Sequence, residues 1–168
     1  FEEPFHAHAI HEYGELARRS GKIKLAGGEG AFNSSMAKHL IDFGKVGYVQ
    51  IDCARIGGIG SAKLVADHAV KRGVTYVNHT FTSHLALSAS IQPYAGLKNH
   101  EICEYPGQPK SLALDITKTY LELDKNTQVR APDAPGLGID INVEGLTHYL
   151  VDVSIELNGR NLYQTPKL

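Results

Sequence analysis

Short apolar segments typical of β-strands alternate along this chain with longer segments of helical period, and this alternation limits the folds open to it. One example of helical spacing is the set Ala62, Val65, Ala66 and Ala69, which Gly73 follows as a helix-ending residue. The expected strands cover residues 23–26, 48–51, 74–77 and 100–105. The expected helices cover residues 8–19, 34–42, capped by Ser34, 61–72 and a short stretch within 83–91. Such an alternation predicts βαβ units, a parallel sheet and an α/β fold.

The pattern changes after residue 105. Segments rich in Pro and Gly occupy residues 106–109 and 130–138, with a short strand expected at 120–123 between them and a short helix capped by Asn142 after them. We therefore expect an α/β domain over residues 1–108, a return segment over residues 109–157, and a polar, loosely held tail over residues 158–168.

Composition narrows the class of protein. Apolar residues make up 42% of the 168 residues and the formal net charge is −1, so the chain lacks the basic excess of a general nucleic-acid or anionic-membrane binder. No apolar run approaches the roughly 18 residues of a membrane span, and no signal peptide is visible. Cys53 and Cys103 make no disulfide framework, which favours a reducing compartment and predicts a cytoplasmic protein. The start at Phe1-Glu2-Glu3-Pro4, without an element start signal, leads us to expect a fragment of a longer protein.

An ionisable residue stands near the carboxyl end of each of the first four expected strands, and another stands at residue 2, ahead of them. These residues are Glu2, Glu29, Asp52, His79 and Glu104, and they are 23 to 27 residues apart, close to one βα unit. Because the carboxyl ends of parallel strands meet at one edge, we expect the five side chains to converge. Side-chain alternation places Gln50 on the same face as Asp52, with Ile51 and Cys53 toward the helices.

This set of side chains suggests a chemistry. Clustered carboxylates repel one another and need a cation or shared protons, and carboxylate oxygens are the ligands that Mg²⁺ prefers. A His beside an Asp is a natural general acid–base pair, because the carboxylate orients the imidazole ring.

Five short motifs, in this order, resemble the enolase superfamily, and specifically its mandelate racemase and acid-sugar dehydratase branch. The motifs are Phe1-Glu-Glu-Pro4, Gly27-Gly-Glu29, Ile51-Asp-x-x-Arg-x-Gly-Gly58, Asn78-His79 and the Pro-rich stretch at 131–138. The resemblance implies that residues 1–108 are the C-terminal half of a (βα)₈ TIM-type barrel, from the end of strand four through strands five to eight. It places the family's third metal ligand, its strand-two lysine base and its capping domain before Phe1.

The resemblance also implies roles for individual residues. Glu2 and Glu29 are similar to the metal-binding carboxylates of strands four and five, and the cofactor implied is Mg²⁺. Asp52 and His79 look like the catalytic dyad of strands six and seven. Glu104 resembles the strand-eight acid, with Glu101 as the competing position, and Arg55 falls where a basic, substrate-binding residue is common.

The activity implied for the whole protein is removal of the proton alpha to a carboxylate through an enediolate, followed by loss of a β-hydroxyl. The protein would then be a Mg²⁺-dependent acid-sugar dehydratase acting on a small-molecule carboxylate, and a homo-oligomer, with this chain inactive alone. One alternative is a racemase or epimerase of a 2-hydroxy acid. Another, from a different class, is a truncated half-barrel without catalytic function.

Overall fold

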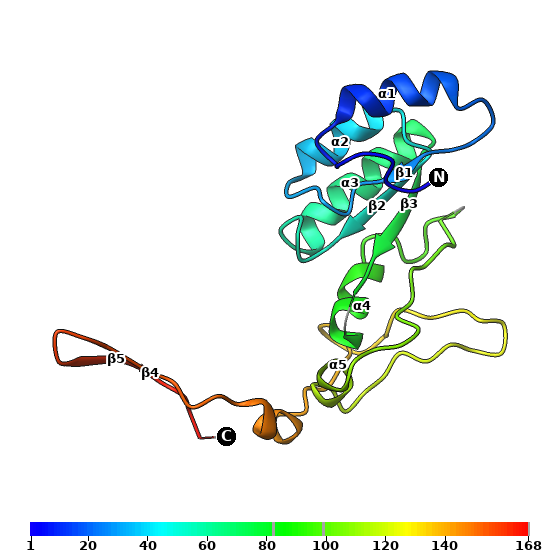
Figure 1. Ribbon diagram of the computed structural model, residues 1–168. Helices are drawn as coiled ribbons and strands as arrows, with labels where there is room; N and C mark the ends of the chain where they lie inside the picture. The colour runs from blue at the N-terminus through cyan, green and yellow to red at the C-terminus, as the bar shows by residue number, and fades with distance from the viewer. Residues whose placement is uncertain (82, 99, 168) are drawn as a thin grey trace.

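The computed structural model describes residues 1–81, 83–98 and 100–167, and within them it shows a parallel sheet covered by helices (Figure 1). The helices and strands, in chain order, are α1 (Ile10–Arg19), β1 (Ala26–Gly27), α2 (Ser34–Asp42), β2 (Tyr48–Asp52), α3 (Ile59–Arg72), β3 (Thr75–His79), α4 (His84–Ile91), α5 (Ser111–Asp115), the 3₁₀ helix η1 (Glu144–Tyr149), β4 (Ser154–Leu157) and β5 (Arg160–Gln164). The first three strands form one parallel sheet in the order β1-β2-β3. The α/β class and the parallel sheet are as predicted.

The helices begin and end where local chemistry allows. The predicted cap at Ser34 is wrong by one residue, because Oδ1 of Asn33 accepts the Met36 amide at 2.9 Å and so starts α2. The prediction for the end of α3 is confirmed: Gly73 has a φ of 67°, a left-handed conformation that glycine adopts without strain.

The core lies between the sheet and the helices α2 and α3. Val49 and Ile51 of β2 are fully buried against them, whereas Gln50 and Asp52, on the other face of the same strand, are only partly buried. The predicted alternation along β2 is therefore confirmed, and it leaves the polar side chains of β2 on the face away from the helices.

Two expected strands are absent, although all of their residues are described. Residues 100–105 and 120–123 form no strand because side chains take the place of strand partners. The Tyr76 amide of β3 donates to Nδ1 of His100, and the Leu121 amide donates to Nδ1 of the buried His84. The strand expected at 23–26 also begins late, because β1 covers only Ala26–Gly27.

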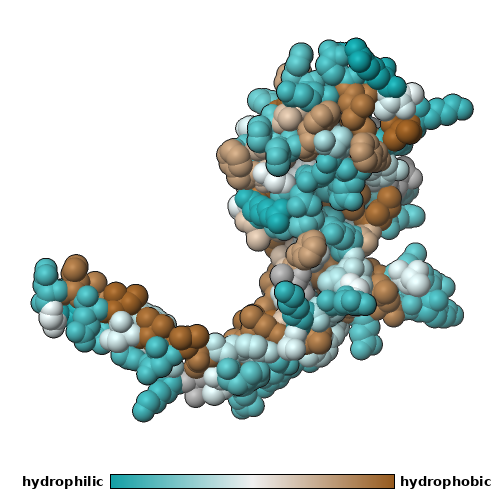
Figure 2. Space-filling view, in the orientation of Figure 1, coloured by the Kyte–Doolittle hydropathy of each residue, from teal (hydrophilic) through white to brown (hydrophobic). Residues whose placement is uncertain are grey.

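Within the region expected as a polar tail, residues 158–164 contribute to a hairpin in which β4 pairs with β5 in antiparallel fashion. Its turn is Asn158-Gly159, both with positive φ, the dipeptide that two-residue hairpin loops favour. The hairpin extends away from the rest of the molecule (Figure 1) and carries an apolar stripe in Figure 2 that includes the exposed Ile155, Leu157 and Leu162.

None of the helices in the described part of the chain is both long and apolar enough to cross a membrane.

Candidate active site

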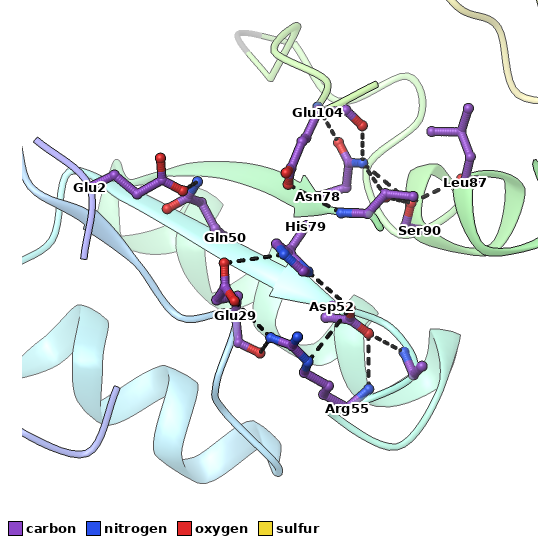
Figure 3. Close-up of polar contacts among 12 residues, drawn as sticks. Glu2, Glu29, Gln50, Asp52, Arg55, Asn78, His79, Leu87, Ser90 and Glu104 are labelled. Carbon is purple, nitrogen blue, oxygen red and sulfur yellow. Dashed lines mark hydrogen bonds and ion pairs between the residues drawn. The ribbon is translucent and has the colours of Figure 1, made fainter. Parts of the chain in front are cut away.

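His79, at the carboxyl end of β3, is the centre of a chain of polar contacts (Figure 3). Its Nδ1 lies 2.9 Å from Oδ2 of Asp52, and its Nε2 lies 3.1 Å from Oε2 of Glu29. The imidazole is 2% exposed, and both of its nitrogens face carboxylate oxygens. The ring is thus fixed between the ends of two neighbouring parallel segments of chain.

Asp52 ends β2 and is held by the turn that follows it. Its Oδ1 accepts the amides of Ala54 and Arg55 at 2.8 and 3.0 Å, which leaves Oδ2 free to face His79. Burial raises the pKa of Asp52, but hydrogen bonds from the Arg55 amide, His79 and the Ala54 amide outweigh burial, so its pKa lies below the ordinary value. Asp52 is therefore an ionised partner for His79 near neutral pH.

Glu29 follows β1 through a turn that requires glycine. Gly28 has a φ of 125°, and a Cβ there would lie 2.9 Å from the Gln50 carbonyl oxygen. The turn brings Oε1 of Glu29 to 2.8 Å from the guanidinium of Arg55, and this bond raises the pKa of Arg55. Arg55 is also 4.0 Å from Asp52, so it links the two carboxylates that hold His79.

The segment before α1 brings further carboxylates to the same edge. Glu2 forms a parallel bridge with Ala26, and its Oε1 accepts from Nε2 of Gln50 at 2.7 Å. Burial, and then the negative charge of Glu29, raise the pKa of Glu3. The Gln50 Oε1 atom is buried without a hydrogen-bond partner among the described residues.

These carboxylates have the chemistry that a hard divalent cation such as Mg²⁺ needs, because they offer oxygen ligands. A bound cation would also relieve the repulsion between their negative charges. Glu2 and Glu29 are the two that could hold it. Among residues 1–81, 83–98 and 100–167, however, no three His, Cys, Asp or Glu side chains are grouped as a metal site. The described residues by themselves therefore form no complete metal site.

Glu104 approaches His79 from the other side, and Glu101 does not. Oε2 of Glu104 accepts the Thr80 amide at 3.1 Å, directly after His79 on the chain. Glu101 is exposed and lines different hollows, one with His100 and Cys103. Of the two competing positions, the structure brings only Glu104 to the end of β3.

Two hollows lie next to these residues and share Thr80 and Phe81. One, of about 470 Å³, is lined by Asp52, Arg55 and His79 together with apolar side chains of α3 and α4. The other, of about 400 Å³, is lined by Glu104, Lys110 and a Pro-rich loop. Four of the predicted side chains, those of Asp52, Arg55, His79 and Glu104, therefore border space in which a small molecule fits.

Three side chains that shape the site have no role predicted from sequence: Gln50, Asn78 and Thr80. Gln50 was detectable, since its parity with Asp52 places it on the same face. Asn78 and Thr80 make contacts with residue 104, and nothing in the local sequence pattern indicates such distant partners.

Comparisons with known proteins agree with this geometry. A family model described as enolase C-terminal domain-like matches residues 1–145. The crystal structure of a predicted mandelate racemase from Rhodobacter sphaeroides is 55% identical, with a TM-score of 0.92 over 98% of this chain and 42% of that chain. The 3,6-anhydro-D-galactonate cycloisomerase from Zobellia galactanivorans is 30% identical, with a TM-score of 0.79 over 90% of this chain and 42% of that chain.

Two further relatives are enzymes, named as a cycloisomerase and a dehydratase. A D-galactarolactone cycloisomerase from Agrobacterium fabrum is 26% identical over 89% of this chain and 41% of its own length. A D-xylonate dehydratase from Haloferax volcanii is 23% identical over 84% of this chain and 34% of its own length. The chain thus spans 34% to 42% of the length of these four proteins. It belongs to the enolase superfamily, in the enolase C-terminal domain-like family, as its resemblance to mandelate racemases and acid-sugar dehydratases predicted.

Proposed function

We propose that this chain is the C-terminal half of a (βα)₈ barrel, and that the protein containing it is a Mg²⁺-dependent acid-sugar dehydratase. The observation that carries the proposal is the buried His79, held at Nδ1 by Asp52 and facing Glu29 at Nε2. A buried imidazole oriented by an ionised carboxylate, at the edge where parallel strands end, is the arrangement that general acid–base catalysis requires.

In this proposal His79 moves the protons. Asp52 fixes Nδ1, so Nε2 is the atom that exchanges a proton with the substrate. In a dehydration the neutral imidazole of His79 takes the proton alpha to the carboxylate, the β carbon–oxygen bond breaks, and the resulting imidazolium gives that proton to the departing hydroxyl, which leaves as water. The resulting enol tautomerises to a 2-keto acid, so atoms and charge balance without a further reactant.

Glu29 covers Nε2 in this structure, so it must turn away from His79 before a substrate reaches that nitrogen. Glu29 and Glu2 are the residues that would hold Mg²⁺. When bound, the ion would supply positive charge for the substrate carboxylate, which makes the neighbouring carbon more acidic.

Glu104 and Arg55 complete the set of polar groups around the hollows. Glu104 is placed to bond the substrate carboxylate or the oxygen that becomes negative during the reaction. Arg55, with 48% of its side chain exposed, is placed to bind a carboxylate or hydroxyl of the substrate. We assign these two residues to substrate orientation.

The proposal extends to the organisation of the protein. Residues 1–108 would form the barrel portion and residues 109–157 the return segment, followed by the tail over residues 158–168, in which residues 160–164 form β5. The missing barrel strands, a third metal ligand and a base on the opposite face of the substrate would come from chain before Phe1. We propose that the protein is cytoplasmic, in keeping with its free cysteines. We also propose that it is a homo-oligomer and that it acts on a small-molecule carboxylate.

A racemase or epimerase of 2-hydroxy acids is the second candidate, and the name of the Rhodobacter sphaeroides structure favours it. Both reactions begin by removing the same α-proton. They differ in whether a β-hydroxyl then leaves or the proton returns to the other face.

The test uses the full-length protein with Mg²⁺ and a panel of D-xylonate, D-galactonate and mandelate. Formation of 2-keto acid is followed by semicarbazone absorbance, and α-proton exchange in deuterium oxide by NMR. Keto acid from a sugar acid, lost in His79→Asn, supports the dehydratase. Exchange without keto acid supports the racemase. If neither signal is observed with any acid, both candidate reactions are contradicted. The alternative of a half-barrel without catalytic function then remains.

A further inference from the structure

The side chain of Asn78 forms hydrogen bonds with both backbone polar groups of Glu104. Its Oδ1 accepts the Glu104 amide at 3.0 Å, and its Nδ2 donates to the Glu104 carbonyl at 2.9 Å (Figure 3). The Tyr94 hydroxyl donates to the same Oδ1 at 2.8 Å. Asn78 is fully buried, so these contacts are shielded from competing water.

The side-chain amide of Asn78 makes the two hydrogen bonds that the backbone of a neighbouring strand would otherwise make with Glu104. Residues 100–105 run past β3 without forming a strand, so the backbone of Glu104 would have no partner on β3 without Asn78. An asparagine amide offers one acceptor and two donors, which is what a backbone N–H and C=O side by side need. Aspartate would keep the acceptor but lose the donor, and alanine would leave both groups without their partner.

A second contact, from Thr80 directly after β3, fixes the other end of Glu104. The Thr80 amide donates to the Glu104 carboxylate at 3.1 Å, so backbone and carboxylate are both tied to residues that flank His79. Residues 78, 79 and 80 are consecutive. The distance between the imidazole and the carboxylate is therefore set within three residues of one segment.

We propose that Asn78 is a positioning residue for Glu104: it sets where the carboxylate lies relative to His79 and to the hollow lined by both Thr80 and Glu104. The inference deepens the proposed function, because it assumes that Glu104 orients the substrate. It also makes a statement about the position of Glu104 that can be tested without substrate.

The test compares Asn78→Ala with Ser88→Ala in the full-length protein with Mg²⁺. Ser88 is a matched control, since it is equally buried in α4 and loses a hydrogen bond to the Leu137 carbonyl, away from His79 and Glu104. Hydrogen exchange measured by mass spectrometry on the peptide containing Glu104 is expected to quicken at least about tenfold in Asn78→Ala and to stay unchanged in Ser88→Ala. Unchanged exchange in both variants overturns the inference.

Kinetics provide the second readout. We expect Asn78→Ala to lower kcat by about 10- to 100-fold with a smaller change in KM, because a displaced group loses orientation. In a Glu104→Gln background the same substitution is expected to cost less than about threefold, since the two residues act as a unit. Equal costs in the two backgrounds would show that Asn78 acts by another route.

The two proposals fail separately. If no acid is turned over, the proposed function fails, and exchange at Glu104 still decides whether Asn78 positions it. If Asn78→Ala does not fold, the isosteric Asn78→Asp replaces it, because that variant keeps the acceptor for the Glu104 amide and loses only the donor to the Glu104 carbonyl. It should give the same pattern at smaller amplitude, and an unchanged exchange rate at Glu104 would contradict the inference.

Discussion

His79 and Asp52 are register partners on the adjacent parallel strands β3 and β2, and the imidazole Nδ1 lies 2.9 Å from the carboxylate Oδ2. The pairing of the strands therefore also pairs the two side chains. A second His–Asp pair, His68 and Asp42, joins α3 to α2 at 3.0 Å, away from the strand ends. The His68–Asp42 pair can therefore serve as a structural control for the candidate catalytic pair His79–Asp52.

We expect His79→Asn in the full-length protein to lower kcat by at least about 100-fold, since general acid–base catalysis contributes on that order. Mg²⁺ affinity should stay close to that of the unmodified protein, because the imidazole is not an assigned ligand. Steady-state kinetics and calorimetry measure the two quantities. The matched control, His68→Asn, should retain turnover, and a similar loss in both variants would contradict the assignment.

Asp52→Asn should lower turnover and also change how stability depends on pH. The pKa of Asp52 is lowered in the folded protein, so its ionised form stabilises the fold fully above the unfolded value of about 3.9 and loses that effect as pH falls through the folded value. The melting temperature of Asp52→Asn should therefore lie below that of the unmodified protein near pH 6, and the gap should close below about pH 4.

Thermal unfolding followed across this pH range measures the gap. Asp67→Asn is the control for loss of a surface charge, because Asp67 pairs with Lys63 on the exposed side of α3. A gap for Asp52→Asn that stays constant from pH 6 to pH 3 would show that the lowered pKa is not the source of the stabilisation.

Glu29→Gln in the full-length protein should weaken Mg²⁺ binding at least about tenfold, because it removes a charged oxygen ligand. The exposed Glu12 of α1 provides the control variant Glu12→Gln, with affinity expected to be unchanged. Residues 1–168 alone should show no micromolar affinity, since they supply only part of the ligand set. Calorimetry distinguishes these cases, and unaltered binding by Glu29→Gln would remove Glu29 from the ligands.

The isolated chain should self-associate or remain partly molten, without dehydratase or racemase activity. Two features favour association: the described residues provide no strand on the outer side of Phe1–Glu3, and the hairpin exposes apolar side chains such as Leu157 and Leu162. Light scattering and thermal unfolding test this. A monomer with one cooperative transition would contradict it, whereas reduced association of Leu157→Lys would identify the hairpin as a cause.

Much of the sheet and the pair at its centre could be predicted from sequence because the signals are local. The helical spacing in residues 61–72 and the glycine after it fix α3, and strand alternation places Asp52 opposite the buried Ile51. The similar lengths of successive βα units then bring Asp52 and His79 to the same level.

The rest depends on partners far along the chain. Residues 100–105 have the composition of a strand, but their hydrogen bonds go to side chains such as Asn78, 26 residues from Glu104. The hairpin of β4 and β5 is absent from the prediction for a different reason. The polar residues around Asn158-Gly159 suggest a tail, although Asn-Gly is itself a strong local signal for a hairpin turn.

The contact between β3 and residues 100–105 also affects how this protein tolerates mutation. A backbone ladder survives most substitutions, because every residue except proline brings the same donor and acceptor. Here side chains, chiefly those of Asn78 and His100, make the hydrogen bonds between β3 and residues 100–105. A single substitution at either position can therefore weaken this contact. Sequence drift at these two positions, of which Asn78 is fully buried, can thus shift the acid at residue 104 while the dyad at residues 52 and 79 stays intact, a route by which related proteins could diverge in the acids they accept.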